Sequence, residues 1–166
     1  MKNWSRVVMM WLCLTATAAI AKPPTATFDF GFDDTSLQGE MQGARADEHQ
    51  RLDALNAQLR DMLVKSGCCS IVDIGRVAKR AHDLDMRTCN GCDVDLAREV
   101  GARISVTGWV QKVSNLILNI NVVARDVTSG KVIEAGSVDI RGNTDESWSR
   151  GLSYLLRERL HPAEWR

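Results

Sequence analysis

The longest regular pattern in the sequence is an alternation of apolar and other side chains between residues 104 and 140. Turn-forming residues at Ser114-Asn115 and at 126–130 divide this region into three segments. Successive side chains of a strand point to opposite faces, so each segment has one apolar face. The apolar positions are Ile104, Val106, Val110, Leu116, Leu118, Ile120, Val122, Val138 and Ile140. The pattern therefore predicts three strands joined by hairpins and buried on one side.

Glycines indicate irregular points in these strands. Gly108 predicts either a bulge or a close approach of another segment to the backbone. In the third segment, Ile133 and Ala135 are out of phase with the later apolar residues. One extra residue near Gly136, a β-bulge, would bring them all to the same face.

Apolar residues outside this region recur at the helical period of 3.6 residues. Asn143 and Glu146 resemble a capping box before the last helix. The predicted helices cover Asp47 to Gly67, 76–86, 93–100 and the stretch from the Asn143 cap to Leu160, and the predicted short strands cover 27–32 and 68–74. The order β-α-β-α-α-β-β-β-α predicts an α/β (α+β) fold, a mixed sheet with helices packed on it, in a single domain over residues 22–166.

The first 21 residues have the composition of an export signal. Lys2 and Arg6 precede an uncharged apolar run, which ends in Ala19-Ile20-Ala21. Small residues at these positions predict cleavage after Ala21 and release into the periplasm; an uncleaved anchor is the alternative. The apolar run is too short to cross a hydrocarbon core of about 30 Å, and no membrane span is expected in the mature chain.

The charge balance bears on the class of partner. Lys and Arg together number 21, as do Asp and Glu, and removal of Lys2 and Arg6 leaves the mature chain slightly acidic. Nucleic acids and anionic membranes select proteins with a basic excess or patch. We therefore expect neither as a partner, and expect a periplasmic or envelope protein instead.

Four cysteines remain after the signal: Cys68, Cys69, Cys89 and Cys92. An even number in an exported chain predicts two disulfides. A bond between the adjacent Cys68 and Cys69 would close a strained ring, so the two favoured connectivities both join this pair to Cys89 and Cys92. Two alternatives stay open: a redox pair at Cys89 and Cys92, and a zinc site of these thiolates with or without His82.

No sequence motif predicts catalysis. The chain contains no glycine-rich phosphate loop, no nucleophile elbow and no zinc-protease motif. His49, His82 and His161 are scattered along the chain and fit solvated or capping roles better than that of a base. We expect a protein that is not an enzyme, with no catalytic residues, no cofactor and no metal.

The predicted strand after residue 103 also carries the best candidate for a binding residue. One of its faces holds Thr107, Trp109, Gln111 and Val113, and Trp109 is an aromatic of the kind that dominates binding hot spots. We predict that Trp109, Gln111 and Val113 contact a protein partner. An exposed sheet edge near the polar loop 33–46 would add strand pairing with the partner, and the same loop offers an alternative function, carriage of a small ligand.

Parts of the sequence resemble a known family. They are Asp34-Thr-Ser-Leu-Gln-Gly-Glu40, Val106-Thr-Gly-Trp-Val-Gln-Lys-Val-Ser-Asn-Leu-Ile-Leu118, Arg125-Asp126 with Thr128-Ser-Gly130, and Ser137-Val-Asp-Ile-Arg-Gly-Asn-Thr-Asp-Glu-Ser-Trp148. Together they resemble an uncharacterised family of exported bacterial proteins, a domain of unknown function that is distantly similar to the amino-terminal domain of TolB. The resemblance implies a periplasmic α/β domain that works by contacting other proteins, and it supplies no catalytic residues.

Overall fold

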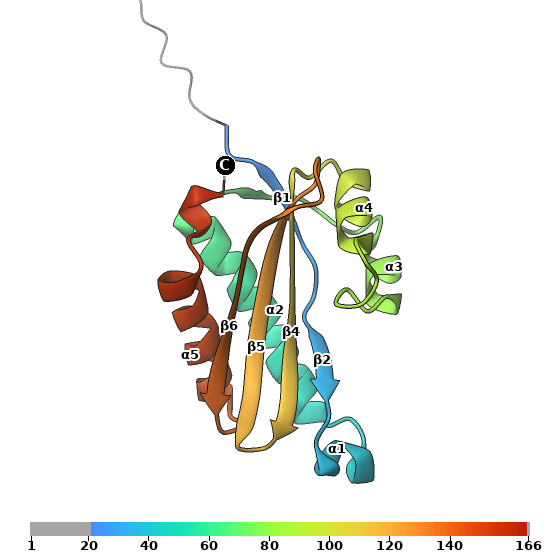
Figure 1. Cartoon of the computed structure of the whole chain (residues 1–166), viewed down its shortest axis with the longest axis vertical. Coiled ribbons are helices and arrows are strands. Elements are labelled where there is room, and N and C mark those ends of the chain that lie inside the picture. Colours follow the sequence, from blue (N-terminus) through green and yellow to red (C-terminus); the bar gives the residue numbers. More distant parts are fainter. Residues whose placement is uncertain (1–20, 166) are drawn as a thin grey trace, which may run out of the picture.

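The computed structural model describes residues 21–165 and contains a six-stranded mixed sheet (Figure 1). The strand order is β3-β1-β4-β5-β6, and β2 pairs with β4 beyond the end of β1. β1, β2 and β3 run parallel to their neighbours, whereas β4, β5 and β6 form the antiparallel meander that the alternation predicts. The strands are β1 Pro24–Thr27, β2 Gly31–Asp34, β3 Ser70–Ile71, β4 Ile104–Ser114, β5 Ile117–Asp126 and β6 Val132–Arg141.

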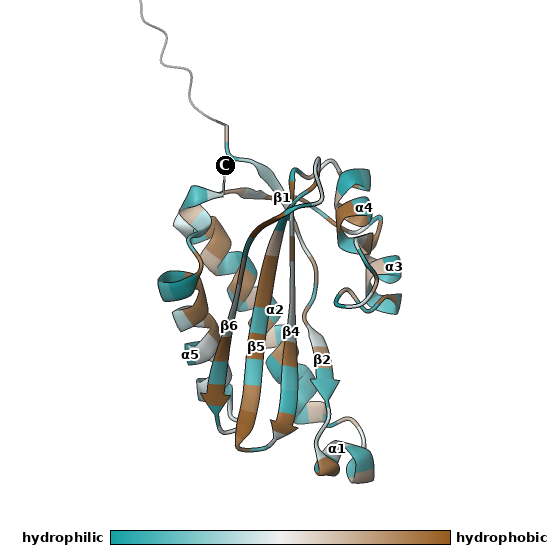
Figure 2. Ribbon diagram, viewed as in Figure 1, coloured by the Kyte–Doolittle hydropathy of each residue, from teal (hydrophilic) through white to brown (hydrophobic). Residues whose placement is uncertain are grey.

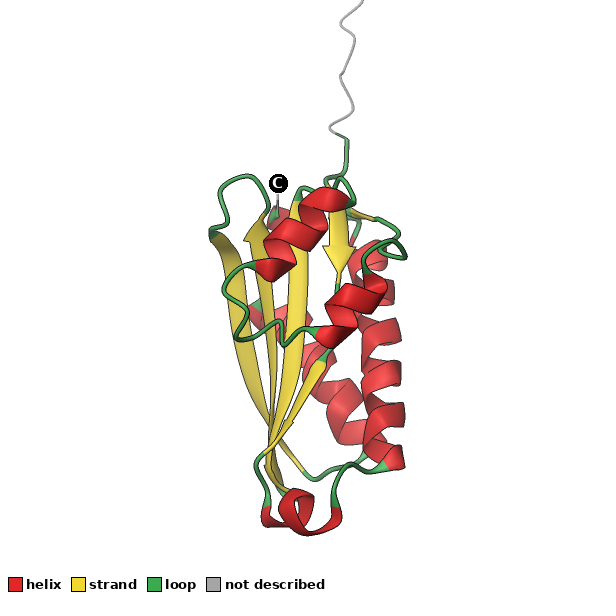
Figure 3. Ribbon diagram, turned by 90° about the vertical axis from the view of Figure 1, so that its right-hand side faces the viewer, coloured by secondary structure: helices red, strands yellow, loops and turns green. Residues whose placement is uncertain are grey.

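Helices cover one face of the meander and one side of the sheet. α2 and α5 lie together on the same face of β4, β5 and β6, while α3 and α4 lie beside β1 and β2 (Figures 1 and 3). The helices are α1 Leu37–Gln42, α2 Ala46–Ser66, α3 Ala78–Asp83, α4 Cys92–Glu99 and α5 Asp145–Tyr154, with a π-helical turn Leu155–Arg159 and a 3-10 turn Pro162–Glu164. The predicted mixed sheet with packed helices is confirmed.

The core divides into two clusters. The larger one joins the leucines of α2 and α5 to the alternating residues of the meander. The alternation is visible along β5 in Figure 2 as successive hydrophobic and hydrophilic bands. The smaller one lies under α4 and includes Phe28, Val77, Val94 and Leu96. None of the helices in residues 21–165 is long and apolar enough to cross a membrane.

The phenylalanine-rich first strand is broken, although the alternation predicts one strand over residues 27–32. The chain leaves β4 at residues 28–30, where the Phe30 amide donates to Asn56 Oδ1 at 2.8 Å, and returns as β2. Phe28 and Phe30 are both buried, in different core clusters. The Phe30 ring lies so close to Gly108 that a Cβ there would collide with it. Of the two expectations for Gly108, close approach is therefore the correct one.

The predicted bulge near Gly136 is wrong. The strand register shifts at Val113 and at Ile133 instead, and Ile133 and Ala135 stay on the exposed face. A Cβ on Gly136 would lie 2.9 Å from a methyl group of Leu155. The absence of a side chain at Gly136 therefore lets the π-helical turn pack directly against β6.

Two helix predictions also need correction. α3 is shorter than the predicted 76–86, and α5 is capped one residue later than expected, by Thr144, whose side chain accepts from the Ser147 amide. Asn143 instead turns its side chain toward α2. The predicted signal peptide covers residues 1–21, of which residues 1–20 lie outside the described residues.

Candidate functional site

The two faces of β4 differ in what covers them. Val106 and Val110 are fully buried against α2 and α5. On the other face, Ser105 and Thr107 are covered beside α4, and the Ser105 hydroxyl donates to Asp93 at 2.8 Å. Beyond Thr107, this face is turned away from α2 and α5 (Figure 1), and α3 with the loop after it approaches the face at Trp109. We call it the open face.

The open face carries the three residues predicted to contact a partner. Trp109 and Gln111 are partly exposed, and Val113 is 52% exposed. Their neighbours on β5 are polar: Asn121 is opposite Trp109 and Asn119 is opposite Gln111. The structure thus brings the predicted residues together on one uncovered surface. Their role in partner binding stays a prediction.

Trp109 also borders a hollow at the sheet edge. On its other side β4 pairs with β2, where Gly31 is opposite Trp109. A cavity of about 330 Å³ between β2 and α3 is lined by Trp109, by Phe30 and Phe32, and by the apolar residues of α3 and the loop after it. A second cavity of about 290 Å³ adjoins it and shares Trp109, Gly31 and Leu84. Trp109 therefore connects the open face to this hollow.

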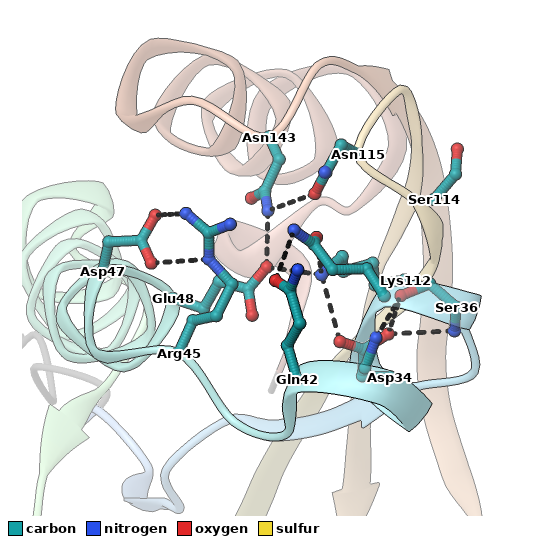
Figure 4. Close-up of polar contacts among 12 residues, drawn as sticks. Asp34, Ser36, Gln42, Arg45, Asp47, Glu48, Lys112, Ser114, Asn115 and Asn143 are labelled. Atoms are coloured by element: carbon teal, nitrogen blue, oxygen red, sulfur yellow. Dashed lines mark hydrogen bonds and ion pairs between the residues drawn. The ribbon is translucent and has the colours of Figure 1, made fainter.

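At the far end of β4, Lys112 is buried on the face that α2 covers (Figure 4). Its ammonium group donates to Glu48 of α2 at 2.7 Å, to Asp34 of β2 at 3.0 Å and to Gln38 of α1 at 3.2 Å. Glu48 is 1% exposed, and its second carboxylate oxygen has no hydrogen-bond partner among the described residues. One buried cation thus joins three separate segments.

The network continues to the start of α5. The Asn143 side-chain amide donates to Glu48 at 2.6 Å (Figure 4). The Asn143 side-chain oxygen accepts from the Trp148 indole at 3.0 Å. Arg51 of α2 donates to the same oxygen at 3.3 Å and to Asp145 at 2.7 Å. These contacts fix the first turn of α5 against α2.

The charges in this network support each other. Burial alone would lower the pKa of Lys112, but hydrogen bonds to Glu48 and Asp34 raise it above its ordinary value. Burial alone would raise the pKa of Asp34, but hydrogen bonds from Ser36 and Lys112 hold it below its ordinary value. Lys112 and Asp34 therefore both keep their charges at neutral pH.

The network fixes the loop 33–46, which the sequence offers as a ligand-binding segment. Lys112 holds its beginning through Asp34 and its short helix α1 through Gln38. A Cβ on Gly39 would collide with the Asp34 carboxylate, so α1 lies directly against this group. We interpret the Lys112 network as a structural clamp. Carriage of a ligand by this loop stays an untested alternative.

The cysteines pair differently from the prediction. Cys89 and Cys92 form a disulfide with each other, and Cys68 and Cys69 are buried free thiols. The favoured connectivities, which join the two pairs, are therefore wrong. The reason is tertiary: the first pair packs in the core at the end of α2, whereas the second lies in the half-buried loop before α4.

The three histidines do not come together. His49 and His82 line the hollow beside β2, and His161 lies near the chain end, where its backbone amide donates to Glu134. Among residues 21–165, no group of three or more His, Cys, Asp or Glu side chains is placed to hold a metal ion.

Solved structures similar to this one share its fold at low sequence identity. The C-terminal domain of LpoB from Salmonella enterica is 18% identical, with a TM-score of 0.52, over 77% of this chain and 89% of that one. The LpoB domain from Escherichia coli is 17% identical, with a TM-score of 0.51, over 76% of this chain and 88% of that one. A chain of a PelC dodecamer from Paraburkholderia phytofirmans is 12% identical, with a TM-score of 0.54, over 90% of this chain and 93% of that one. The comparison supports an LpoB- and PelC-like fold and does not support the finer resemblance to TolB.

Sequence comparisons place the chain in a family. No curated protein matches it. A family model described as "Protein of unknown function (DUF2380)" matches residues 23–160, which include every strand of the sheet and α5. The chain therefore belongs to this family of proteins of unknown function.

Proposed function

We propose that the chain is an exported, non-enzymatic protein-binding module of the cell envelope, and that the open face binds its partner. The observation that carries the proposal is the uncovered surface around Trp109. A large aromatic side chain lies there among amide side chains, on a strand whose other face is fully buried. Rigid aromatic anchors with polar neighbours are typical of protein interfaces.

The cellular location rests on the sequence. The first 21 residues have the composition of a cleaved export signal. The likeness to LpoB and PelC concerns the fold of the domain. One of the PelC structures is a dodecamer. The partner that binds the open face can therefore be a second copy of this chain, in which case the open face mediates self-assembly.

The test begins with photo-crosslinking in cells. A photoreactive residue at Gln111 should capture the partner, whereas one at Tyr154, an exposed aromatic position on α5, should not. With the captured protein in hand, Trp109→Ala should weaken binding by about 2 kcal/mol, or about 30-fold, and leave the melting temperature nearly unchanged. Tyr154→Ala is the matched control and should bind normally.

Two results would contradict the proposal. One is equal capture from both positions, because the open face would then have no preference. The other is a large fall in the melting temperature of Trp109→Ala with normal binding by the folded fraction, which would make Trp109 a core residue.

The Cys89–Cys92 disulfide supports a second candidate, thiol–disulfide exchange. The bond is half-buried, and Cys92 is the first residue of α4, where the helix N-terminus stabilises a thiolate. Catalysed reduction of insulin, lost in Cys89→Ser, would support this candidate. A rate equal to that without protein would remove it.

A further inference from the structure

The side of the sheet next to β1 and β2 is only half closed. β3 pairs with the outer edge of β1, at Pro24 and Thr25. β2 continues the line of β1 along β4, but no strand of the described chain pairs with its outer edge (Figure 1). The sheet therefore has a position for one more short strand, below β3 and beside β2.

The outer edge of β2 presents backbone groups in that position. In a parallel ladder, alternate residues of a strand direct their N–H and C=O groups to the same neighbour. The Thr35 amide donates to the Lys112 carbonyl at 2.9 Å, so Asp33 and Gly31 also face β4. Phe32 and Asp34 consequently direct their backbone groups outward. Such groups pair readily with an added strand.

The space beside these groups is a groove. We call it the β2 groove; its walls are β2 with Trp109 on one side, and α3 with the loop after it on the other. The two adjoining cavities of about 330 and 290 Å³ make up its length. The lining of the first cavity is largely apolar, and Leu84, which lines both cavities on the far wall, is 41% exposed. An extended chain places every second side chain on one face, so its apolar residues would reach this lining.

The charges around the groove favour a basic occupant. Its lower part is lined by the carboxylates of Asp33, Asp83 and Asp85. Two cations face these three carboxylates: Arg87 pairs with Asp33 and Asp85, and Lys79 of α3 pairs with Asp83. Arg87 donates to Asp33 at 2.7 Å across the groove, and both side chains are partly exposed. Exposed ion pairs contribute little stability, so a lysine or arginine of an incoming chain can replace Arg87 on Asp33.

We propose that the β2 groove binds an extended segment of a protein partner that alternates apolar and basic residues. The segment pairs with the outward backbone groups of Phe32 and Asp34 as an added strand. It places its apolar side chains toward Phe32 and Leu84, and its basic side chains on the opposite face, which carries Asp33 and Trp109. This inference rests on the proposed function, because Trp109 belongs to both the open face and the groove. It adds the binding mode and the chemistry of the partner.

The test uses the mature protein and a blocked hexapeptide of sequence Lys-Val-Lys-Val-Lys-Val at about 1 mM, a concentration that detects even millimolar affinity. Amide hydrogen exchange, followed by NMR, should slow at Phe32 and Asp34 when the peptide binds. Asp33, whose amide already faces β4, is the internal control and should not change. A peptide N-methylated at alternate residues and a peptide with Glu in place of Lys should give no protection.

Variants of the groove wall locate the peptide. Leu84→Asp should weaken binding at least about tenfold, because it places a carboxylate in the apolar lining. Leu116→Asp, at a 72% exposed leucine on the turn between β4 and β5, is the matched control and should bind normally. Unchanged exchange at Phe32, or equal binding of the N-methylated peptide, would overturn the proposal.

The two proposals fail in different ways. A captured partner that is weakened by Trp109→Ala but not by Leu84→Asp would leave the open face as the binding site and remove the groove. A partner that is insensitive to both variants would contradict the proposed function itself.

Discussion

The two faces of β4 differ in how completely their side chains are buried. On the face toward α2, the strand buries Val106, Val110 and the charged Lys112, and every side chain there has a fixed neighbour. On the open face, Trp109 keeps exposed apolar surface next to Asn121 of β5, and Val113 is 52% exposed. Apolar surface left exposed on one side of a fully packed strand points to binding, whereas a charge buried on the other side points to architecture.

The strongest test of this contrast is Lys112→Met. The substitution keeps most of the side-chain volume but leaves Glu48 as a buried carboxylate without its cation. Removing one partner of a buried ion pair costs about 3–5 kcal/mol of unfolding free energy. Urea denaturation should show this loss, while Lys131→Met, at an exposed lysine, should change the stability by less than about 0.5 kcal/mol. Equal stability of the two variants would show that Lys112 is not a clamp.

A matched pair of valines on the same strand gives the next largest difference. Val110 is fully buried against α2, and Val113 is 52% exposed. We expect Val110→Ala to lower the free energy of unfolding by about 2 kcal/mol, through lost burial and the cavity it leaves. Val113→Ala should stay within about 0.5 kcal/mol of the parent. A large loss at Val113 would mean that the open face is covered in solution, for instance by a second copy.

Local periodicity is enough to predict the meander and the long helix. The alternation over residues 104–140 and the leucine spacing of α2 each repeat over many residues, and they specify which face is buried. The open face with Trp109 follows from the same alternation. These parts of the fold depend on neighbours in the sequence, so the sequence alone reveals them.

The parts that could not be predicted depend on distant segments. The break in the first strand comes from Asn56 and Gly108, which meet it only in the folded chain. The disulfide between Cys89 and Cys92 likewise depends on where the core places the other cysteine pair. For the clamp a signal does exist: Lys112 shares the phase of Val106 and Val110, which places it on the buried face. Its partners still come from α1, α2 and β2.

Acid should weaken the clamp through Asp34. Its pKa is held below the ordinary value in the folded chain, by hydrogen bonds from Ser36 and Lys112 that outweigh the effect of burial. A group with a depressed folded pKa contributes stability above its unfolded pKa, near 3.8, and loses that contribution as the pH falls through the folded pKa. We expect Asp34→Asn to be about 2 kcal/mol less stable than the parent at pH 7, because hydrogen bonds to a charged group are lost.

The difference between Asp34→Asn and the parent should shrink as the pH falls below about 4 and vanish once Asp34 is protonated. Unfolding curves at a series of pH values measure it directly. A difference that stays constant down to the acid limit would show that Asp34 acts through shape rather than charge.

The smallest expected effect concerns the two cysteine pairs, which divide in the same way as the two faces of β4. Cys68 and Cys69 are buried beside the leucines of α2, and the half-buried Cys89–Cys92 pair is already bonded. A hydrogen bond with Cys69 lowers the pKa of Cys68 to about 7, and its effect on Cys69 is to raise the pKa. This hydrogen bond favours the thiolate of Cys68, which is the reactive form.

Because the lowered pKa favours the reactive form of Cys68, we expect burial to be what protects this thiol. Native protein without reductant should take up no iodoacetamide and keep its melting temperature, whereas unfolding in urea should expose two alkylatable thiols, and added reductant two more. Mass spectrometry after each treatment counts them. Rapid alkylation of Cys68 in the native state would show that solvent reaches this end of α2. The face of the sheet that α2 covers would then be less completely buried than the exposures of its side chains indicate.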